Sequence, residues 1–272
     1  GTMGKAGYLL IHEDPEGFRF VKHPWGYWGN VLLHLGIVFV IGASLALVVT
    51  ETRGLLQILT GETHLPSDPW LAEETAMLGK PFVLPEAVRL DRVEADYWET
   101  DDVKHLETII SFIGPEGKEQ QYPLGVNRTV NDKGLRIYQG RRYGDGFYVT
   151  LTDGGGREIN TIFQMEHPFR RNEASYGNFD PQGVQYRIND KYFANPERQT
   201  IRTLHPLLVM RLVEGNRVIA EVSLKVGESG AFGPYTAKLV HVSPWSEILF
   251  VRSKGMSGIF VGFVILIMGS SL

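Results

Sequence analysis

Two stretches of the chain are almost free of charge, and a long polar stretch separates them. The first, residues 31–49, reads VLLHLGIVFVIGASLALVV and contains no formally charged residue. At about 1.5 Å per residue it is long enough, or nearly so, to cross the roughly 30 Å hydrocarbon core of a bilayer. It shows no amphipathic period, which disfavours the alternative of a soluble core helix. Trp25, Tyr27 and Trp28 precede it as an interfacial aromatic belt would.

The second apolar stretch, residues 256–272, reads MSGIFVGFVILIMGSSL and is short for a membrane span. We expect either that residues 248–251 extend it or that the natural protein continues beyond it. Gly258 with Gly262, and Gly42 with Ala46, form pairs of small residues that favour close helix contact in lipid. The alternative stays open, because small residues are common in membrane helices in general.

The polar middle of the chain is predicted to be β-rich. Strand-like runs flank turn sequences at residues 135–150 and 158–163, at 104–113 and 121–126, and at 207–213 and 218–226. This spacing is typical of an antiparallel sandwich or barrel-like domain. Residues 66–74 are expected to form a polar linker with one helical turn.

These patterns predict a membrane protein in which transmembrane α-helices flank a mainly antiparallel β domain. The expected division is an N-terminal cytoplasmic or interfacial segment, a transmembrane helix, the β-rich domain and a second, truncated transmembrane helix. Their boundaries are residues 1–28, 29–50, 51–247 and 248–272. Lys5, Arg19 and Lys22 place the N-terminal flank on the cytoplasmic side, so the β domain is expected to be extracytoplasmic.

Composition narrows the function classes. The net charge is −4 and no basic run stands out, so nucleic-acid binding is not expected. The chain has no cysteine, which excludes disulfides, thiolate metal sites and cysteine nucleophiles. It begins Gly1-Thr2-Met3, which we interpret as a cloning scar or a piece of a longer protein. No phosphate loop, HExxH motif or other catalytic signature is present, so no catalytic residue is predicted.

His34 is the candidate site residue. An ionisable side chain inside a membrane helix is costly and usually has a partner or a function. His34 lies six residues past Trp28, roughly 9 Å deeper along a helix, a depth that suits an axial ligand of haem iron. The alternative is a hydrogen bond to a neighbouring helix. The histidines of the middle region, by contrast, are interpreted as surface or strand residues: His64, His105, His167, His205 and His241.

Three stretches together resemble the ResB family of cytochrome c biogenesis. The first runs from Trp25-Gly26-Tyr27-Trp28-Gly29 to His34-Leu35-Gly36. The second is Val126-Asn127-Arg128, then Gly134-Leu135-Arg136-Ile137-Tyr138-Gln139 and Tyr143-Gly144. The third is Ile248-Leu249-Phe250-Val251-Arg252. Thr129-Val130 departs from the Pro-Leu of the family pattern, and the two helices that usually precede the histidine helix are missing here.

The resemblance implies a subunit of the System II cytochrome c synthase in the bacterial cytoplasmic membrane, with its large domain on the periplasmic side. Such a subunit works with a ResC- or CcsA-type membrane partner, carries haem b across the bilayer and presents it to apocytochrome c. It is part of a synthase rather than a self-sufficient enzyme. His34 would supply one axial ligand to the haem iron. The alternative is an interaction or assembly subunit of a larger respiratory complex that binds no haem.

Overall fold

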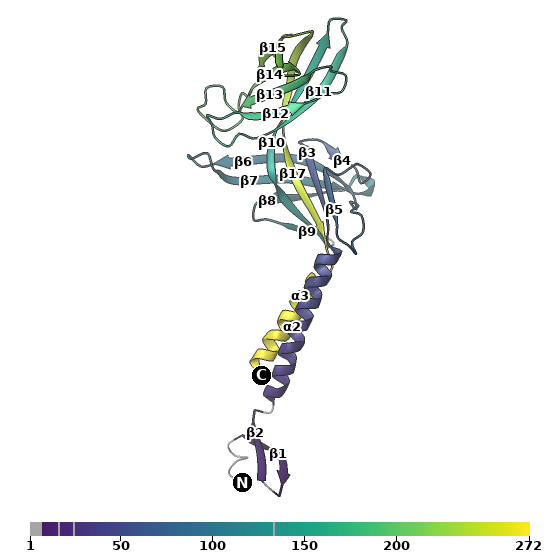
Figure 1. The fold of residues 1–272 in the computed structure, drawn as a ribbon, viewed down its shortest axis with the longest axis vertical. Coiled ribbons are helices and arrows are strands. Elements are labelled where there is room, and N and C mark those ends of the chain that lie inside the picture. The colour runs from purple at the N-terminus through teal and green to yellow at the C-terminus, as the bar shows by residue number, and fades with distance from the viewer. Residues whose placement is uncertain (1–6, 16, 24, 133) are drawn as a thin grey trace. The chain divides into compact units, whose positions relative to one another are not determined.

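The computed structural model describes residues 7–15, 17–23, 25–132 and 134–272, so residues 1–3 and Lys5 lie outside it. The described residues form two helices and many strands (Figure 1). The helices are α2 (Trp25–Thr50) and α3 (Met256–Ser271), with the 3₁₀ turn η1 (Pro115–Gly117). The strands are β1 (Tyr8–Asp14), β2 (Gly17–Lys22), β3 (Thr52–Leu59), β4 (Thr63–His64), β5 (Ala72–Thr75), β6 (Ala87–Tyr97), β7 (Val103–Ile113), β8 (Glu119–Gly125), β9 (Val130–Asp132), β10 (Leu135–Asp153), β11 (Glu158–Glu166), β12 (Ser175–Phe179), β13 (Arg187–Phe193), β14 (Leu207–Glu214), β15 (Arg217–Leu224), β16 (Ser229–Phe232) and β17 (Tyr235–Arg252).

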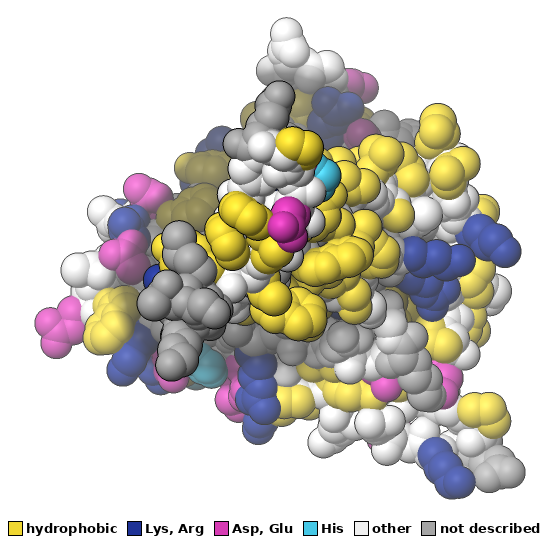
Figure 2. Space-filling model, turned by 90° about the horizontal axis from the view of Figure 1, so that it is seen from below, with side chains coloured by type: hydrophobic (Ala, Val, Ile, Leu, Met, Phe, Trp, Pro, Cys, Tyr) yellow, Lys and Arg dark blue, Asp and Glu magenta, His cyan; other side chains and the backbone are white. Residues whose placement is uncertain are grey.

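The chain divides into two compact units. One contains the β1–β2 hairpin, the two helices and residues 74–81, and the other contains the remaining strands. Within the described residues, α2 alone is long and apolar enough to cross a membrane, and α3 is a shorter apolar helix. At about 1.5 Å per residue, the 26 residues of α2 extend over roughly 39 Å. Figure 2, which is seen from below, shows apolar side chains grouped together with few charged ones among them.

Helices α2 and α3 pack side by side through small residues (Figure 1). A Cβ atom added at Gly36 would lie 2.8 Å from Leu266 Cγ, and one at Gly269 would lie 2.6 Å from the Leu33 nitrogen. Gly258 and Gly262 also face α2, which confirms the predicted close contact for this pair. A Cβ at Gly42 meets nothing within 4 Å, so the pair it forms with Ala46 is not part of this contact.

The β-rich unit is built from antiparallel strands, as predicted. One sheet has seven strands, with the order β11-β10-β17-β3-β5 and with β9 and β16 attached. Two four-stranded sheets have the orders β12-β13-β14-β15 and β4-β6-β7-β8. The three expected hairpins are present as the antiparallel pairs β10–β11, β14–β15 and β7–β8.

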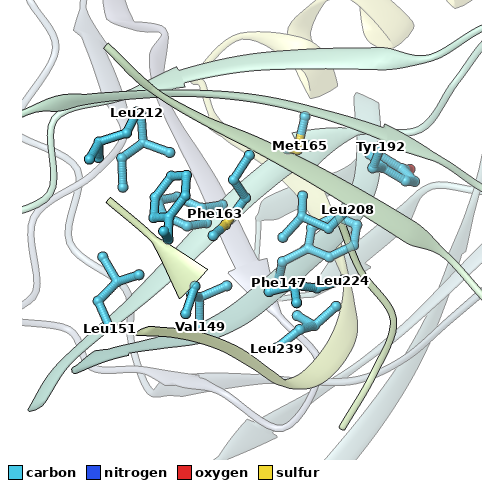
Figure 3. Close-up of a cluster of buried hydrophobic side chains, with 14 of the residues drawn as sticks. Phe147, Val149, Leu151, Phe163, Met165, Tyr192, Leu208, Leu212, Leu224 and Leu239 are labelled. Carbon is cyan, nitrogen blue, oxygen red and sulfur yellow. The ribbon is translucent and has the colours of Figure 1, made fainter. Parts of the chain in front are cut away.

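Two hydrophobic cores lie within this unit, and the long strands β10 and β17 contribute to both. Figure 3 shows the first core, where Phe147 and Phe163 come from paired strands and Tyr192 and Leu208 come from β13 and β14. The second core includes Leu56, Leu90, Ile110 and Phe250. In β6 and β13 alternate residues are buried, which is the expected pattern for sheets with one buried face.

Two sequence-based expectations are wrong. Residues 248–252 belong to the end of β17 and do not extend the second helix, which begins at Met256. Ile248 and Phe250 are fully buried in the second core, so burial in a sheet accounts for their apolar character. Residues 66–74 contain turns and the start of β5 and no helical turn.

Candidate functional site

His34 lies in the third turn of α2, on the helix face opposite the contact with α3. Gly36, which packs against Leu266, marks the face that contacts α3. His34 precedes Gly36 by two residues, which is about 200° around the helix axis. Its side chain is accordingly exposed. The alternative that His34 hydrogen-bonds to the neighbouring helix does not hold for α3, the helix that packs against α2 in this structure.

One ring nitrogen of His34 is already in use. Nδ1 lies 2.8 Å from the carbonyl oxygen of Asn30, one turn earlier in α2. A carbonyl oxygen only accepts, so Nδ1 carries the proton and donates it. In a neutral ring, Nε2 then keeps its lone pair. This is the tautomer that a metal-ligating imidazole needs, with the second nitrogen held by a backbone carbonyl.

His34 therefore fits the role of one ligand to a haem iron. Within the described part of the chain, no group of three or more His, Asp or Glu side chains is arranged to hold a metal ion. A haem iron with two histidine ligands would need its second histidine from outside this helix pair, because α2 and α3 contain no histidine besides His34.

A second constellation lies in the β-rich unit, where the two cores meet. The ring of His167 is stacked between those of Tyr97 and Tyr143, with centroid distances of 5.4 and 5.5 Å. The two tyrosine hydroxyls lie 3.1 Å apart and form a hydrogen bond with each other. Burial is the main cause that raises the pKa of both tyrosines above the ordinary value, so both rings stay protonated at neutral pH.

The same histidine belongs to a buried hydrogen-bond network. His167 Nε2 donates to the Ile201 carbonyl at 2.9 Å. Its Nδ1 lies 3.6 Å from an oxygen of Asp145, and that oxygen accepts hydrogen bonds from the Tyr192 and Thr203 hydroxyls, each at 2.9 Å. These contacts join β10 and β13 to the chain segments after β11 and before β14.

The interpretation of His167 as a surface or strand histidine is wrong. It follows the end of β11, and its side chain is only 7% exposed. With Tyr97, Tyr143 and Asp145 it lines a cavity of about 410 Å³. The network contains no activated nucleophile, since the Tyr192 and Thr203 hydroxyls donate to a carboxylate that already faces the imidazole. We therefore assign it a structural role.

Two residues of the β-domain motif, Gln139 and Tyr143, lie at this junction, and Gly140 lies between them in the chain. Gly140 approaches β17 so closely that a Cβ there would lie 2.3 Å from Glu247 Cβ. Gln139 Nε2 donates to the Ser246 hydroxyl at 2.7 Å, and Tyr143 is one of the stacked rings. The end of the sequence signature thus marks a place where β10 packs against β17.

A family model described as the ResB-like family matches residues 21–227. The chain belongs to the ResB-like family. The match includes His34, the motif region of β10 and the stacked rings. A comparison with curated protein sequences finds no significant match. Membership of the ResB-like family agrees with a role related to cytochrome c biogenesis and with association with a membrane, and α2 is the helix suited to that association.

Proposed function

We propose that this chain is the ResB-like subunit of a System II cytochrome c synthase in a bacterial cytoplasmic membrane. In this role it helps to move haem b across the bilayer and to present it for covalent attachment to apocytochrome c. Helix α2 spans the membrane, and the β-rich unit lies on the periplasmic side. The haem supplies the vinyl groups to which the apocytochrome thiols are joined.

The observation that carries this proposal is the orientation of His34. Its Nδ1 is held by the Asn30 carbonyl, and the residue lies on the side of α2 away from the Gly36 contact with α3. A neutral imidazole held in this way is a ready axial ligand. His34 is thus the cofactor-binding and iron-ligating residue of the proposal.

The same orientation requires a partner. The face of α2 next to α3 is filled by close helix contact, so a second ligand has to approach from the opposite side. We assign that side to a ResC- or CcsA-type membrane subunit. The chain acts as part of a synthase, and its own residues bind and orient rather than perform acid–base steps.

The test is the visible spectrum of the full chain purified with its membrane partner. We expect b-type haem absorbance, and we expect His34→Ala to diminish it together with the yield of holocytochrome c. Added imidazole should restore part of the absorbance, because it can take the place of the missing ring. The matched control is Val38→Ala, one turn along the same exposed face of α2, which should leave the spectrum unchanged.

Unchanged absorbance and cytochrome c yield in His34→Ala would refute the ligand assignment. Co-purification separates the proposal from its alternative. A ResC-like partner supports the synthase subunit. A respiratory complex without such a partner, and without haem that depends on His34, indicates a membrane-anchored assembly subunit instead.

A further inference from the structure

Residues 76–79 form a short loop that is attached to the C-terminal end of α2. The Ala76 amide donates to the Glu51 carbonyl at 2.9 Å, and the Leu78 amide donates to the Val49 carbonyl at 2.8 Å. The Gly79 amide closes a tight turn on the Ala76 carbonyl. The last carbonyls of a helix lack partners within the helix, so these bonds both complete the end of α2 and fix the position of the loop.

The loop presents two large apolar side chains to its surroundings. Met77 is 84% exposed, the highest value among the exposed large apolar side chains of the described residues, and Leu78 is 64% exposed. A scattered apolar residue on a protein surface needs no explanation. Here the two are adjacent, and the backbone bonds hold them beside the end of α2, the one described helix that is long and apolar enough to cross a membrane.

Two lysines lie next to the same helix end. Lys80 follows the loop, and its carbonyl accepts a hydrogen bond from the Thr52 hydroxyl at 3.1 Å. The Lys254 amide donates to the Thr50 hydroxyl at 3.1 Å. Both lysine residues are exposed. The end of α2 therefore lies beside two exposed apolar residues and two exposed lysines, the combination found where a protein meets lipid headgroups.

The depth of the loop follows from the length of α2, and this step rests on the proposed membrane span. If the belt from Trp25 to Trp28 lies at one boundary of the roughly 30 Å hydrocarbon core, about 20 helical residues bring the chain to the other boundary. That boundary falls near Val49, the residue whose carbonyl holds Leu78.

We propose that residues 76–79 are a lipid-docking loop. Met77 and Leu78 insert among the acyl chains of the leaflet at the C-terminal end of α2, and Lys80 and Lys254 lie against lipid phosphates. Lipid is the occupant because the loop continues the surface of the membrane helix. Two side chains are also far smaller than the patch of about 800 Å² that each partner contributes to a standard protein interface.

The absence of cysteine makes a direct depth measurement simple. Met77→Cys carries one nitroxide spin label in the full chain, reconstituted in vesicles of phosphatidylcholine and phosphatidylglycerol. Oxygen concentrates in the acyl region and a nickel chelate stays in water. We therefore expect the label at position 77 to collide mainly with oxygen. The two controls are Val38→Cys in the middle of α2 and Gly154→Cys at a hairpin tip where a side chain meets nothing within 4 Å.

The proposal predicts oxygen-dominated collisions at positions 77 and 38 and nickel-dominated collisions at 154. Nickel-dominated collisions at 77, with oxygen still dominant at 38, would overturn the lipid-docking loop and leave the membrane span intact. Shielding of position 77 from both reagents would mean a protein occupant and would also overturn it. Nickel access at position 38 would refute the span itself, and the loop proposal with it.

Discussion

Asp190 gives the sharpest test of the fold, because it is a carboxyl group buried in an apolar core. It lies on β13 between Ile188 and Tyr192, whose side chains point into the first core. Asp190 is only 2% exposed, and neither of its carboxyl oxygens has a hydrogen-bond partner. Burial therefore raises the pKa of Asp190 well above its ordinary value of 3.8, since the charged form is the costly one.

The direction of the resulting pH dependence is fixed by proton uptake. In the unfolded chain Asp190 ionises near its ordinary pKa of 3.8, and in the folded chain it keeps its proton to higher pH. Between the two pKa values the folded state holds one more proton, so the free energy of unfolding falls as pH rises. The free energy of unfolding falls by about 1.4 kcal/mol per pH unit, and this fall ends at the pKa of Asp190 in the folded state.

The perturbation is Asp190→Asn, which keeps the shape of the side chain and removes its titration. Below pH 4 the variant and the parent chain should have similar free energies of unfolding. Above pH 4 the free energy of unfolding of the variant should exceed that of the parent by about 1.4 kcal/mol more for each pH unit, up to the folded pKa of Asp190. The assay is urea unfolding of the full chain in detergent micelles at several pH values, followed by tryptophan fluorescence, to which the buried Trp245 contributes. Parallel stability curves for the two proteins would refute the argument.

Two further predictions concern an ion pair and the helix contact. The Arg171 guanidinium lowers the pKa of Asp101, so this carboxylate stabilises the fold above its ordinary pKa of 3.8 and loses that effect as pH falls through the lowered value. Asp101→Asn should therefore destabilise the β-rich unit at pH 7 and much less in acid. In the same unfolding assay, the difference in unfolding free energy between variant and parent should change with pH in the direction opposite to that of Asp190→Asn. Gly262→Ala places a Cβ 2.5 Å from Val40 Cγ2 and should weaken the pairing of α2 with α3 by about 1–3 kcal/mol. The control, Gly42→Ala, should change the pairing by less than about 0.5 kcal/mol. Spin-label distances between the helices measure both effects, and equal effects would contradict the contact.

Much of the fold could be predicted because its signals are local. The turn sequences at residues 114–117, 153–156 and 214–216 fix three hairpins without reference to the rest of the chain. The apolar run of α2 is also a local signal. The error at residues 248–252 has the opposite origin. A short apolar run reads alike in a buried strand and in a membrane helix, and only the partner strands of β17 decide between them.

The junction of the two cores could not be predicted from the sequence. Tyr97, Tyr143 and His167 come from separate parts of the chain, and their stacking depends on the pairing of long strands. One signal was available, because the motif ending in Tyr143-Gly144 contains glycines at close approaches. A Cβ at Gly144 would lie 1.9 Å from the Met165 carbonyl oxygen, so a side chain there would separate β10 from β11.

His34 shows how far a sequence-based site prediction extends and where the structure adds to it. The sequence singles out the residue because a histidine in an apolar helix is costly. It leaves open which nitrogen is available and on which side of the helix pair the residue lies. The Asn30 carbonyl answers the first question, and the close packing of Gly36 on Leu266 answers the second. Since the contact with α3 leaves the histidine face exposed, a variant that weakens this contact, such as Gly262→Ala, should not remove the ligand itself. Haem binding that depends on His34 and persists in Gly262→Ala would separate the roles of the two helix faces.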